Sequence, residues 1–170
     1  MLSESARMST AKEAGFRIDH PNSTPRAVKV VALDLASVAV VRELADGGWR
    51  NATFFASVSA DWDPNRPRGA PIQASLVDLA GERRDLVEEI GAANLVVMIV
   101  GAGESAEAAA LIADACSLKR VMITGLLLTG ATSTEDDVAR TLKTLRPYAP
   151  MLVVSGEDDY VAAMLTALRA

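Results

Sequence analysis

The sequence predicts a three-layer, Rossmann-like α/β sandwich, in which helices cover both faces of a mostly parallel, six-stranded sheet. Two observations carry this prediction. From residue 27 onward, short apolar runs alternate with stretches of helical periodicity, as in a series of β-α units. Within this series, the apolar run 95–100 breaks into a glycine turn at 101–103 and continues as an alanine-rich helix. A chain of 170 residues, half of them hydrophobic, can bury one substantial core.

Each expected element has a local signal. The helix at 37–46 places Val38, Val41 and Leu44 on one face, and Gly47-Gly48 ends it. The charged, amphipathic segment 82–93 predicts a helix that leads into the strand at 95. In chain order we expect strands at 28–33, 51–56, 72–79, 95–100, 120–128 and 151–155, and helices at 37–46, at 82–93, after the glycine turn, at 134–145 and from about 158.

The chain divides into a polar N-terminal arm at 1–26 and a single Rossmann-like domain at 27–170. The arm mixes Ser, Thr, Pro and Asn with charges, and its apolar positions, such as Phe16 and Ile18, are scattered. We expect an arm or short helix that is disordered or packs on its own chain, in preference to one that binds a partner. The long segment 60–71 contains Asp, Pro and Arg and is expected to be a solvated connection, in preference to a lid over the strand ends.

The overall charge limits the partners. A formal net charge of -5 and a pI near 4.9 argue against a protein that binds nucleic acid or an anionic membrane, because both require a positive surface. No stretch of the sequence is both long and apolar enough to span a membrane, and the first residues lack the apolar core of a signal peptide. We therefore expect a cytoplasmic protein.

The residues that usually carry catalysis are scarce. Cys116 is the single cysteine, lies in the alanine-rich helix and is expected to be a small core residue. His20 is the single histidine and lies in the polar arm, so neither a Ser-His-Asp triad nor a histidine-rich metal site has obvious material. Trp49 and Trp62 are expected to pack at the core or its edge in preference to stacking on a ligand. The sequence identifies no cofactor.

A candidate ligand site lies at the carboxyl ends of the strands, where such sheets bind ligands. The turn at 101–106 fits the pattern G-x-G-x-x-A, whose backbone N–H groups at the start of a helix can hold a phosphate. Glu104 places a negative charge there, and no acidic residue ends the next strand. The expected ligand-binding residues are Gly101, Ala102, Gly103, Ser105, Thr129, Gly130 and Gly156.

These positions also have a structural interpretation. Glycines at strand ends often serve only the turn. Ser133 or Thr134, followed by acidic residues, is good helix-capping chemistry, and Asp158 and Asp159 favour the positive start of the last helix. Asp34 and Ser57 also stand at the carboxyl ends of predicted strands, so we expect them at the same edge of the sheet.

The order and spacing of these elements resemble the GTP-binding domain of the tubulin and FtsZ family. The resemblance begins at the strand 28–31, includes the helix 37–46 and the strand near 54–56, and extends from 85–100 to 151–158. It covers most of residues 28–158 as a pattern of elements. It implies a Rossmann-like nucleotide-binding domain with a phosphate-binding turn at 101–105.

The signature loops depart from that family. The family has a glycine-rich turn after its first strand, whereas this chain has Ala32-Leu33-Asp34-Leu35-Ala36-Ser37, where Asp34 would repel a phosphate. The second phosphate loop is reduced to 101–105, and residues 129–134 offer no match for the ribose and phosphate ligands. We also expect no counterpart of the second family domain. We therefore expect no GTP hydrolysis of the family's kind.

Two classes of function follow. The first is a domain that binds a nucleotide or another phosphate-containing small molecule at the Gly101–Gly103 turn, without GTPase activity. The alternative is a non-catalytic interaction or assembly module with a decayed ligand site, in which an apolar helix face forms a homo-oligomer. A dinucleotide-dependent enzyme is the weakest option, because the sequence offers no evident acid or base.

Overall fold

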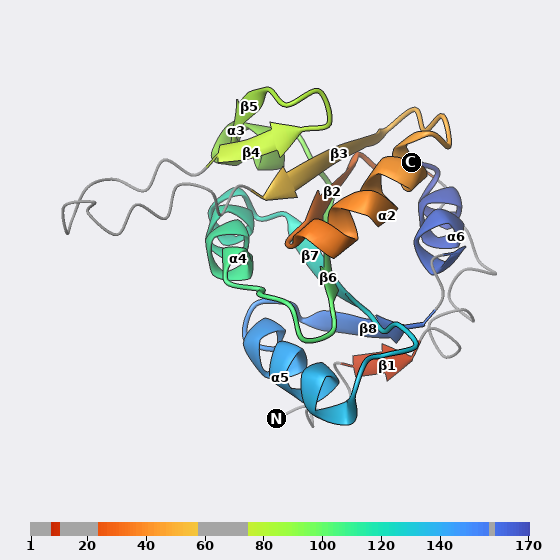
Figure 1. The fold of residues 1–170 in the computed structure, drawn as a ribbon. Helices are drawn as coiled ribbons and strands as arrows, with labels where there is room; N and C mark the ends of the chain where they lie inside the picture. Colours follow the sequence, from red (N-terminus) through yellow and green to blue (C-terminus); the bar gives the residue numbers. More distant parts are fainter. Residues whose placement is uncertain (1–7, 11–23, 58–74, 157–158) are drawn as a thin grey trace.

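The computed structural model describes residues 8–10, 24–57, 75–156 and 159–170. Most of the arm, the segment 60–71, Trp62 and Asp158 lie outside the described residues, so the predictions made for them are left open. Figure 1 shows a central sheet between two helical layers. This arrangement confirms the predicted α/β sandwich with a mostly parallel sheet.

Within the described residues, the sheet contains eight strands in the order β1-β8-β7-β6-β2-β3-β4-β5. All neighbouring strands from β1 to β3 run parallel, whereas β4 and β5 are antiparallel to their neighbours. The bounds are β1 Met8–Thr10, β2 Val28–Ala32, β3 Ala52–Ser57, β4 Ser75–Asp78, β5 Arg83–Asp85, β6 Leu95–Gly101, β7 Met122–Leu128 and β8 Met151–Ser155.

Every predicted strand is present, and two further strands extend the sheet at its edges. At one edge, Met8–Thr10 of the arm forms β1 and pairs with β8. At the other, the predicted helix 82–93 is wrong in its first part, because Arg83–Asp85 pairs with β4 before the helix begins at Leu86. The three residues of this strand are all charged, so they carry no apolar periodicity that could separate a short strand from a first helical turn.

A tight hairpin turn forces β5 to pair with β4. The Asp78 carboxylate accepts the backbone N–H groups of Ala80 and Glu82 at 3.0 and 2.9 Å, and Arg84 forms an ion pair with the same carboxylate. Gly81 adopts φ +90°, a left-handed conformation that glycine takes at low cost. Asp85 then caps the next helix by accepting the N–H of Glu88 at 2.8 Å.

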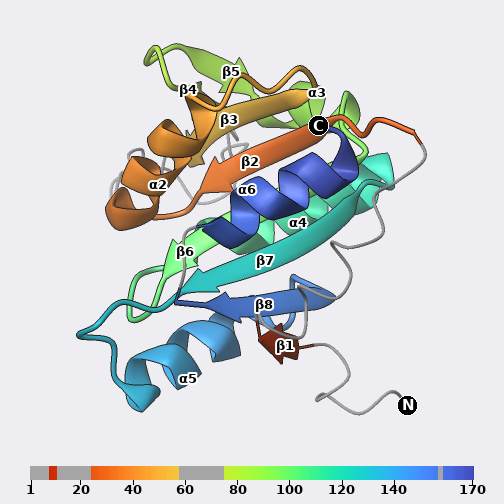
Figure 2. The same cartoon turned by 90° about the vertical axis from the view of Figure 1, so that its right-hand side faces the viewer.

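The helices form two layers on opposite faces of the sheet. Helices α2 (Leu35–Ala45) and α6 (Asp159–Leu168) pack on one face, and α3 (Leu86–Gly91), α4 (Ala108–Lys119) and α5 (Glu135–Leu145) pack on the other. Figure 2 shows α6 in front of the sheet and α4 behind it. Since β6 lies between both layers, residues 95–100 are all buried, which explains why this run is continuously apolar.

Among the helices whose first turn and cap the structure describes, two begin with a capping box. Asp34 exchanges hydrogen bonds with Ser37 at the start of α2, and Thr134 exchanges them with Asp137 at the start of α5. The expected cap at Thr134 is confirmed. The first of these helices begins two residues earlier than predicted, because Asp34 rather than a later residue is its cap.

A buried ion pair links β2 to α3. Lys29 lies mid-strand, and its Nζ atom is 2.8 Å from Glu89 Oε2 and 5.4 Å from the centre of the Phe55 ring. Its side chain is 11% exposed.

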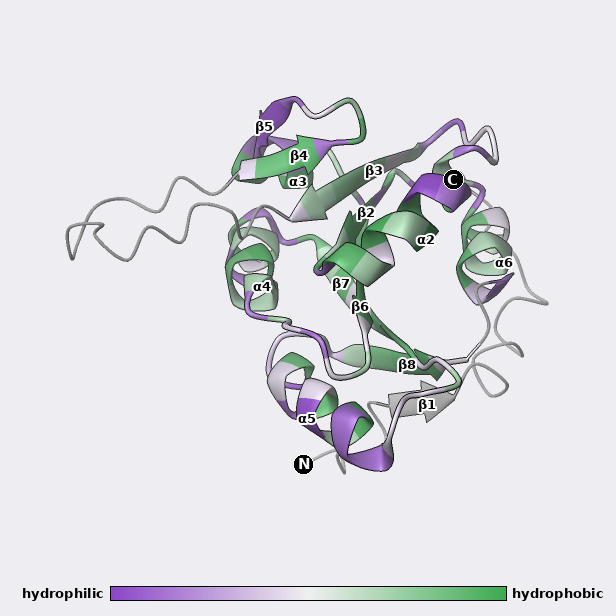
Figure 3. Ribbon diagram, in the orientation of Figure 1, coloured by the Kyte–Doolittle hydropathy of each residue, from purple (hydrophilic) through white to green (hydrophobic). Residues whose placement is uncertain are grey.

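Figure 3 shows hydrophobic residues along the central strands and hydrophilic residues at β5 and at the start of α5. Among the described helices, none is both long and apolar enough to cross a lipid bilayer.

Candidate functional site

The order of the strands places the expected site at one crevice. The six strands that the sequence predicts are arranged as third, second, first, fourth, fifth and sixth, which is β4-β3-β2-β6-β7-β8. In this order the direction of winding reverses between β2 and β6, and ligands of such sheets bind outside the carboxyl ends of these two strands. Asp34 follows β2 at this point, and Gly101 ends β6.

The Asp34 carboxylate occupies this crevice. Its Oδ1 atom accepts the backbone N–H groups of Ala36 and Ser37 at 2.8 and 3.0 Å. Its Oδ2 atom accepts the N–H of Gly101 at 2.9 Å, and the Ser37 hydroxyl lies 2.8 Å away. Donors from the start of α2 and from the end of β6 therefore converge on an anion that belongs to the chain itself. A bound phosphate would use donors of this kind.

The remaining N–H groups of the glycine turn are also engaged. Ala102 donates to the carbonyl oxygen of Leu128 at 2.8 Å, and Gly103 donates to Thr141 Oγ1 at 2.9 Å. Glu104 donates to the carbonyl oxygen of Gly101 at 3.2 Å. The turn is thus held by β7, by α5 and by its own backbone.

Gly103 is required by local geometry. It adopts φ +86°, and a Cβ atom at this position would lie 3.1 Å from Asp137 Oδ1. Helix α5 therefore covers the turn closely. The requirement for glycine at 103 has a structural origin that needs no ligand.

The other predicted residues lie along the same edge of the sheet. Thr129 donates its hydroxyl to the carbonyl oxygen of Ser155 at 3.3 Å, and a Cβ atom on Gly156 would lie 3.3 Å from Thr129 Oγ1. Gly130 donates its N–H to Ser133 Oγ at 2.9 Å. Ser105 is exposed, and its Oγ atom lies 3.5 Å from the Glu107 nitrogen. The fold brings the seven positions to one edge, and local contacts hold their polar groups.

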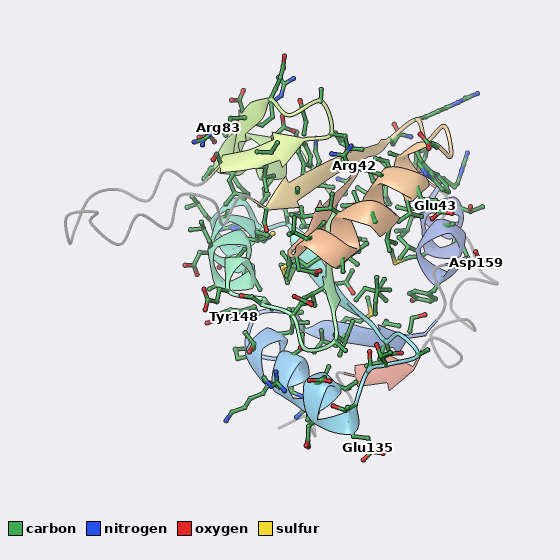
Figure 4. All side chains as sticks on the ribbon, in the orientation of Figure 1. Arg42, Glu43, Arg83, Glu135, Tyr148 and Asp159 are labelled. Atoms are coloured by element: carbon green, nitrogen blue, oxygen red, sulfur yellow. The ribbon has the colours of Figure 1, made fainter. Side chains whose placement is uncertain are left out.

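This edge is acidic. Its described charged residues are Asp34, Glu104, Glu107, Glu135, Asp136, Asp137 and Asp159, and its described segments 33–37, 101–107, 129–137, 155–156 and 159 contain no Lys or Arg. Figure 4 shows Glu135 and Asp159 at the surface, at the starts of α5 and α6. Hydrogen bonds from Thr134 lower the pKa of Asp137 below its usual value, so its carboxylate is charged at neutral pH. Arg140 offsets one of these charges, because its guanidinium lies 2.9 Å from Asp137 Oδ1, and the remaining carboxylates disfavour a phosphate.

A shallow pocket lies beside α5. Of its lining residues, only Thr129 was predicted from the sequence as a ligand-binding residue. Its volume is about 330 Å³, and its lining is mostly apolar. The lining residues are Thr129, Ser133, Thr134, Glu135, Val138, Ala139, Leu142 and Arg146. The spacing of Glu135, Ala139, Leu142 and Arg146 is that of one helical face, and this spacing was the available sequence signal.

Cys116 and Trp49, whose side chains could react with or stack on a ligand, have structural roles in the packing of the domain. Cys116 lies on the buried face of α4 and belongs to the core, as predicted, and burial raises the pKa of its thiol to about 11. Trp49 is half-buried and donates its indole N–H to the carbonyl oxygen of Leu44 at 2.7 Å, which confirms the expected packing. Within the described ranges, no group of three or more His, Cys, Asp or Glu side chains is arranged to hold a metal ion.

The fold and this edge define the class of the protein: a small Rossmann-like α/β domain with its switch-point crevice occupied by a side chain. No protein-family model matches the chain, and no curated protein matches it. Among solved structures, it is similar to PH0766 from Pyrococcus horikoshii OT3, with a TM-score of 0.40 and 15% sequence identity. The alignment covers 99% of this chain and 39% of that protein, so the chain spans well under half the length of its structural relative.

Proposed function

We propose that this domain is a non-catalytic interaction module whose ligand crevice is closed by Asp34. The observation that supports this proposal most directly is the 2.9 Å hydrogen bond from Gly101 N–H to Asp34 Oδ2. A phosphate in the crevice would have to displace a carboxylate that also caps α2. It would then face Glu104, which lies close to the turn. A Cβ atom placed on Gly101 would be 3.2 Å from the Glu104 Cγ atom.

A relationship to the tubulin and FtsZ GTP-binding domain is part of this proposal. The strand order agrees with a nucleotide-binding sheet of the Rossmann type. The departure is Asp34, which stands in the loop where that family has glycines. In this interpretation the domain retains the fold of the family, whereas the loop that would bind phosphate holds Asp34, which makes a structural contact with Gly101.

Exposed apolar side chains support an interaction role. Leu35, Leu118 and Met122 are 91%, 71% and 61% exposed, respectively. Leu118 and Met122 lie four residues apart, at the end of α4 and the start of β7, whereas Leu35 begins α2. Single exposed apolar side chains are common, but neighbouring ones are typical of protein-contact surfaces. We propose that the partners include a second copy of this chain. Sedimentation velocity at micromolar concentration tests this part: a dimer or larger species supports it, and a monomer across the concentration range contradicts it.

The second candidate is a phosphate-containing ligand at the Gly101–Gly103 turn and the start of α4. One observation favours it: the N-cap of α4, Glu107, provides no side-chain hydrogen bond, so the first N–H groups of this helix lack a side-chain cap. Ser105 would be the side-chain donor. Glu104 and Glu107 flank the same position and oppose an anion.

A thermal-shift titration distinguishes the two candidates. The protein is titrated with GTP, GDP, ATP, NAD, coenzyme A and inorganic phosphate, with and without magnesium. A site occupied at a hundredfold above its dissociation constant would add about 2.7 kcal/mol of stability. We expect no dose-dependent shift. A shift that Ser105→Ala weakens would instead establish the phosphate ligand, whereas Asp114→Ala, on the exposed side of α4, serves as the control.

A further inference from the structure

Three arginines that are far apart in sequence meet at the opposite end of the domain, where the parallel strands begin. Arg26 precedes β2, Arg50 precedes β3, and Arg169 follows α6. Arg50 and Arg169 are exposed and Arg26 is partly exposed. We call these three residues the arginine cluster.

Backbone contacts fix the cluster. The N–H of Arg26 donates to the carbonyl oxygen of Leu168 at 3.1 Å, which places it beside Arg169. The side chain of Asn51 donates to the carbonyl oxygen of Arg169 at 3.3 Å, and the N–H of Val28 donates to the carbonyl oxygen of Asn51 at 2.9 Å. The three positions therefore do not depend on long, mobile loops.

Local structure explains only part of this charge. A cation after α6 is favourable at the negative end of a helix, and this accounts for Arg169. It does not account for Arg26 or Arg50, which precede strands. Among the described residues, neither guanidinium of these two forms a hydrogen bond or an ion pair, although Glu43 and Asp46 lie at the end of α2.

We propose that the arginine cluster binds an acidic segment of a partner protein through its carboxylates. This inference rests on the proposed function, an interaction module, and names its partner class. Guanidinium groups bind carboxylates through paired hydrogen bonds, a geometry that lysine does not provide. A short acidic segment contacts only the cluster. Charges elsewhere on the surface lie beyond the Debye length of about 8 Å at physiological salt, so their effect on this segment is screened. A nucleic acid or membrane extends farther and meets the net charge of -5.

Fluorescence anisotropy with a labelled glutamate-rich peptide tests the proposal, with a peptide of equal length that carries glutamine in place of glutamate. The variant Arg26→Ala/Arg50→Ala removes two charges from the cluster. The matched control, Arg120→Gly/Arg140→Ala, removes one charge from the residue after α4 and one from α5. We expect the glutamate peptide alone to bind, its affinity to fall as salt rises, and the cluster variant to lose at least about tenfold while the control loses less than about twofold.

Several outcomes would overturn the proposal. They are no binding of the glutamate peptide at low salt, equal binding of the glutamine peptide, an equal loss in both double variants, or tighter binding of single-stranded DNA or of anionic vesicles. If the cluster variant does not fold, Arg26→Lys/Arg50→Lys, which keeps charge but not fork geometry, provides the comparison. Failure here leaves the nucleotide titration unaffected, because the arginine cluster and the crevice lie at opposite ends of the strands.

Discussion

At the scale of single residues, Asp34 has the largest structural effect for one side chain. Its carboxylate joins the start of α2 to the end of β6 through hydrogen bonds to Ala36, Ser37 and Gly101. An acidic residue after the first strand was expected to repel a phosphate. The structure shows that it also takes up the donors that a phosphate would need.

Replacing Asp34 by alanine tests this role. Asp34→Ala removes the cap of α2 and leaves the Gly101 N–H without its acceptor. Loss of a cap costs about 1 kcal/mol, and an unmet buried donor adds about 1–3 kcal/mol. We expect a decrease of roughly 2 kcal/mol or more in the free energy of unfolding, measured in urea. An equal decrease in the control variant Asp114→Ala, or none in Asp34→Ala, would show that the carboxylate does not hold the crevice.

A second test at the residue scale concerns the end of α4. Arg120 adopts φ 56° and ψ 38°, and its N–H caps the last turn by donating to the carbonyl oxygen of Ser117 at 3.2 Å. Arg120→Gly keeps this bond and removes the cost of the left-handed conformation. The left-handed conformation costs roughly 1–2 kcal/mol, and the greater unfolded-state entropy of glycine offsets about 0.4–1 kcal/mol of the gain, so we expect a net stabilisation of about 0.5–1 kcal/mol, measured by thermal unfolding. Gly103→Ala, with φ +86° and Asp137 close by, is expected to destabilise.

At the scale of elements, two carboxylates hold a turn and a helix start. Asp78 organises the β4-β5 hairpin, and hydrogen bonds from the Glu82 backbone lower the pKa of its carboxyl. Asp137 closes the capping box of α5, and hydrogen bonds from Thr134 lower its pKa. Both pKa values are depressed in the folded state relative to the value of 3.8. The stability that they contribute is therefore present above that value and is lost as pH falls through the folded pKa.

A pH series tests this linkage. We expect the melting temperature to fall as the pH drops below about 4. Asp137→Asn cannot titrate, so its melting temperature should be lower at neutral pH and depend less on pH in the acidic range. Asp114→Asn is the control, and identical acid profiles for all three proteins would contradict the assignment.

The contact between β2 and α3 is also set at the element scale. Lys29 and Glu89 meet in a mostly buried position. Removing one partner leaves the other charge poorly solvated, which costs about 3–5 kcal/mol for fully buried pairs and less here because Glu89 is 24% exposed.

A double-mutant cycle measures that contact. We expect Glu89→Gln and Lys29→Met each to destabilise the protein in urea, and the double variant to be less destabilised than the sum of the two. Additive losses would show that the pair does not interact in solution.

At the scale of the whole molecule, the sheet separates two surfaces of different character. The crevice end is acidic, whereas the arginine cluster lies where the parallel strands begin. Helix ends explain the acidic end and Arg169, because acidic residues stabilise helix starts and basic residues stabilise helix ends, but they do not explain Arg26 and Arg50, which precede strands. The proposed interaction with an acidic segment uses the basic end and leaves the closed crevice aside.

Sequence patterns determined the class of fold. Continuous burial of residues 95–100 and the one-sided helices follow from hydrophobic periodicity, which depends on neighbours in the chain. The cap at Thr134 and the core position of Cys116 were equally local properties. The short strand Arg83–Asp85 was missed because its pairing with β4 depends on the Asp78 turn and not on its own composition.

The seven site residues were placed at one edge by the rule that parallel strands end together. What only the tertiary structure decided is which donors are free there. Gly101 and Asp34 lie 67 positions apart in the sequence, and Gly103 and Thr141 lie 38 apart. A hydrogen bond between such residues depends on distances that strand pairing and helix packing set, so the local pattern of glycines, by itself, determined the turn but not whether it could receive a ligand.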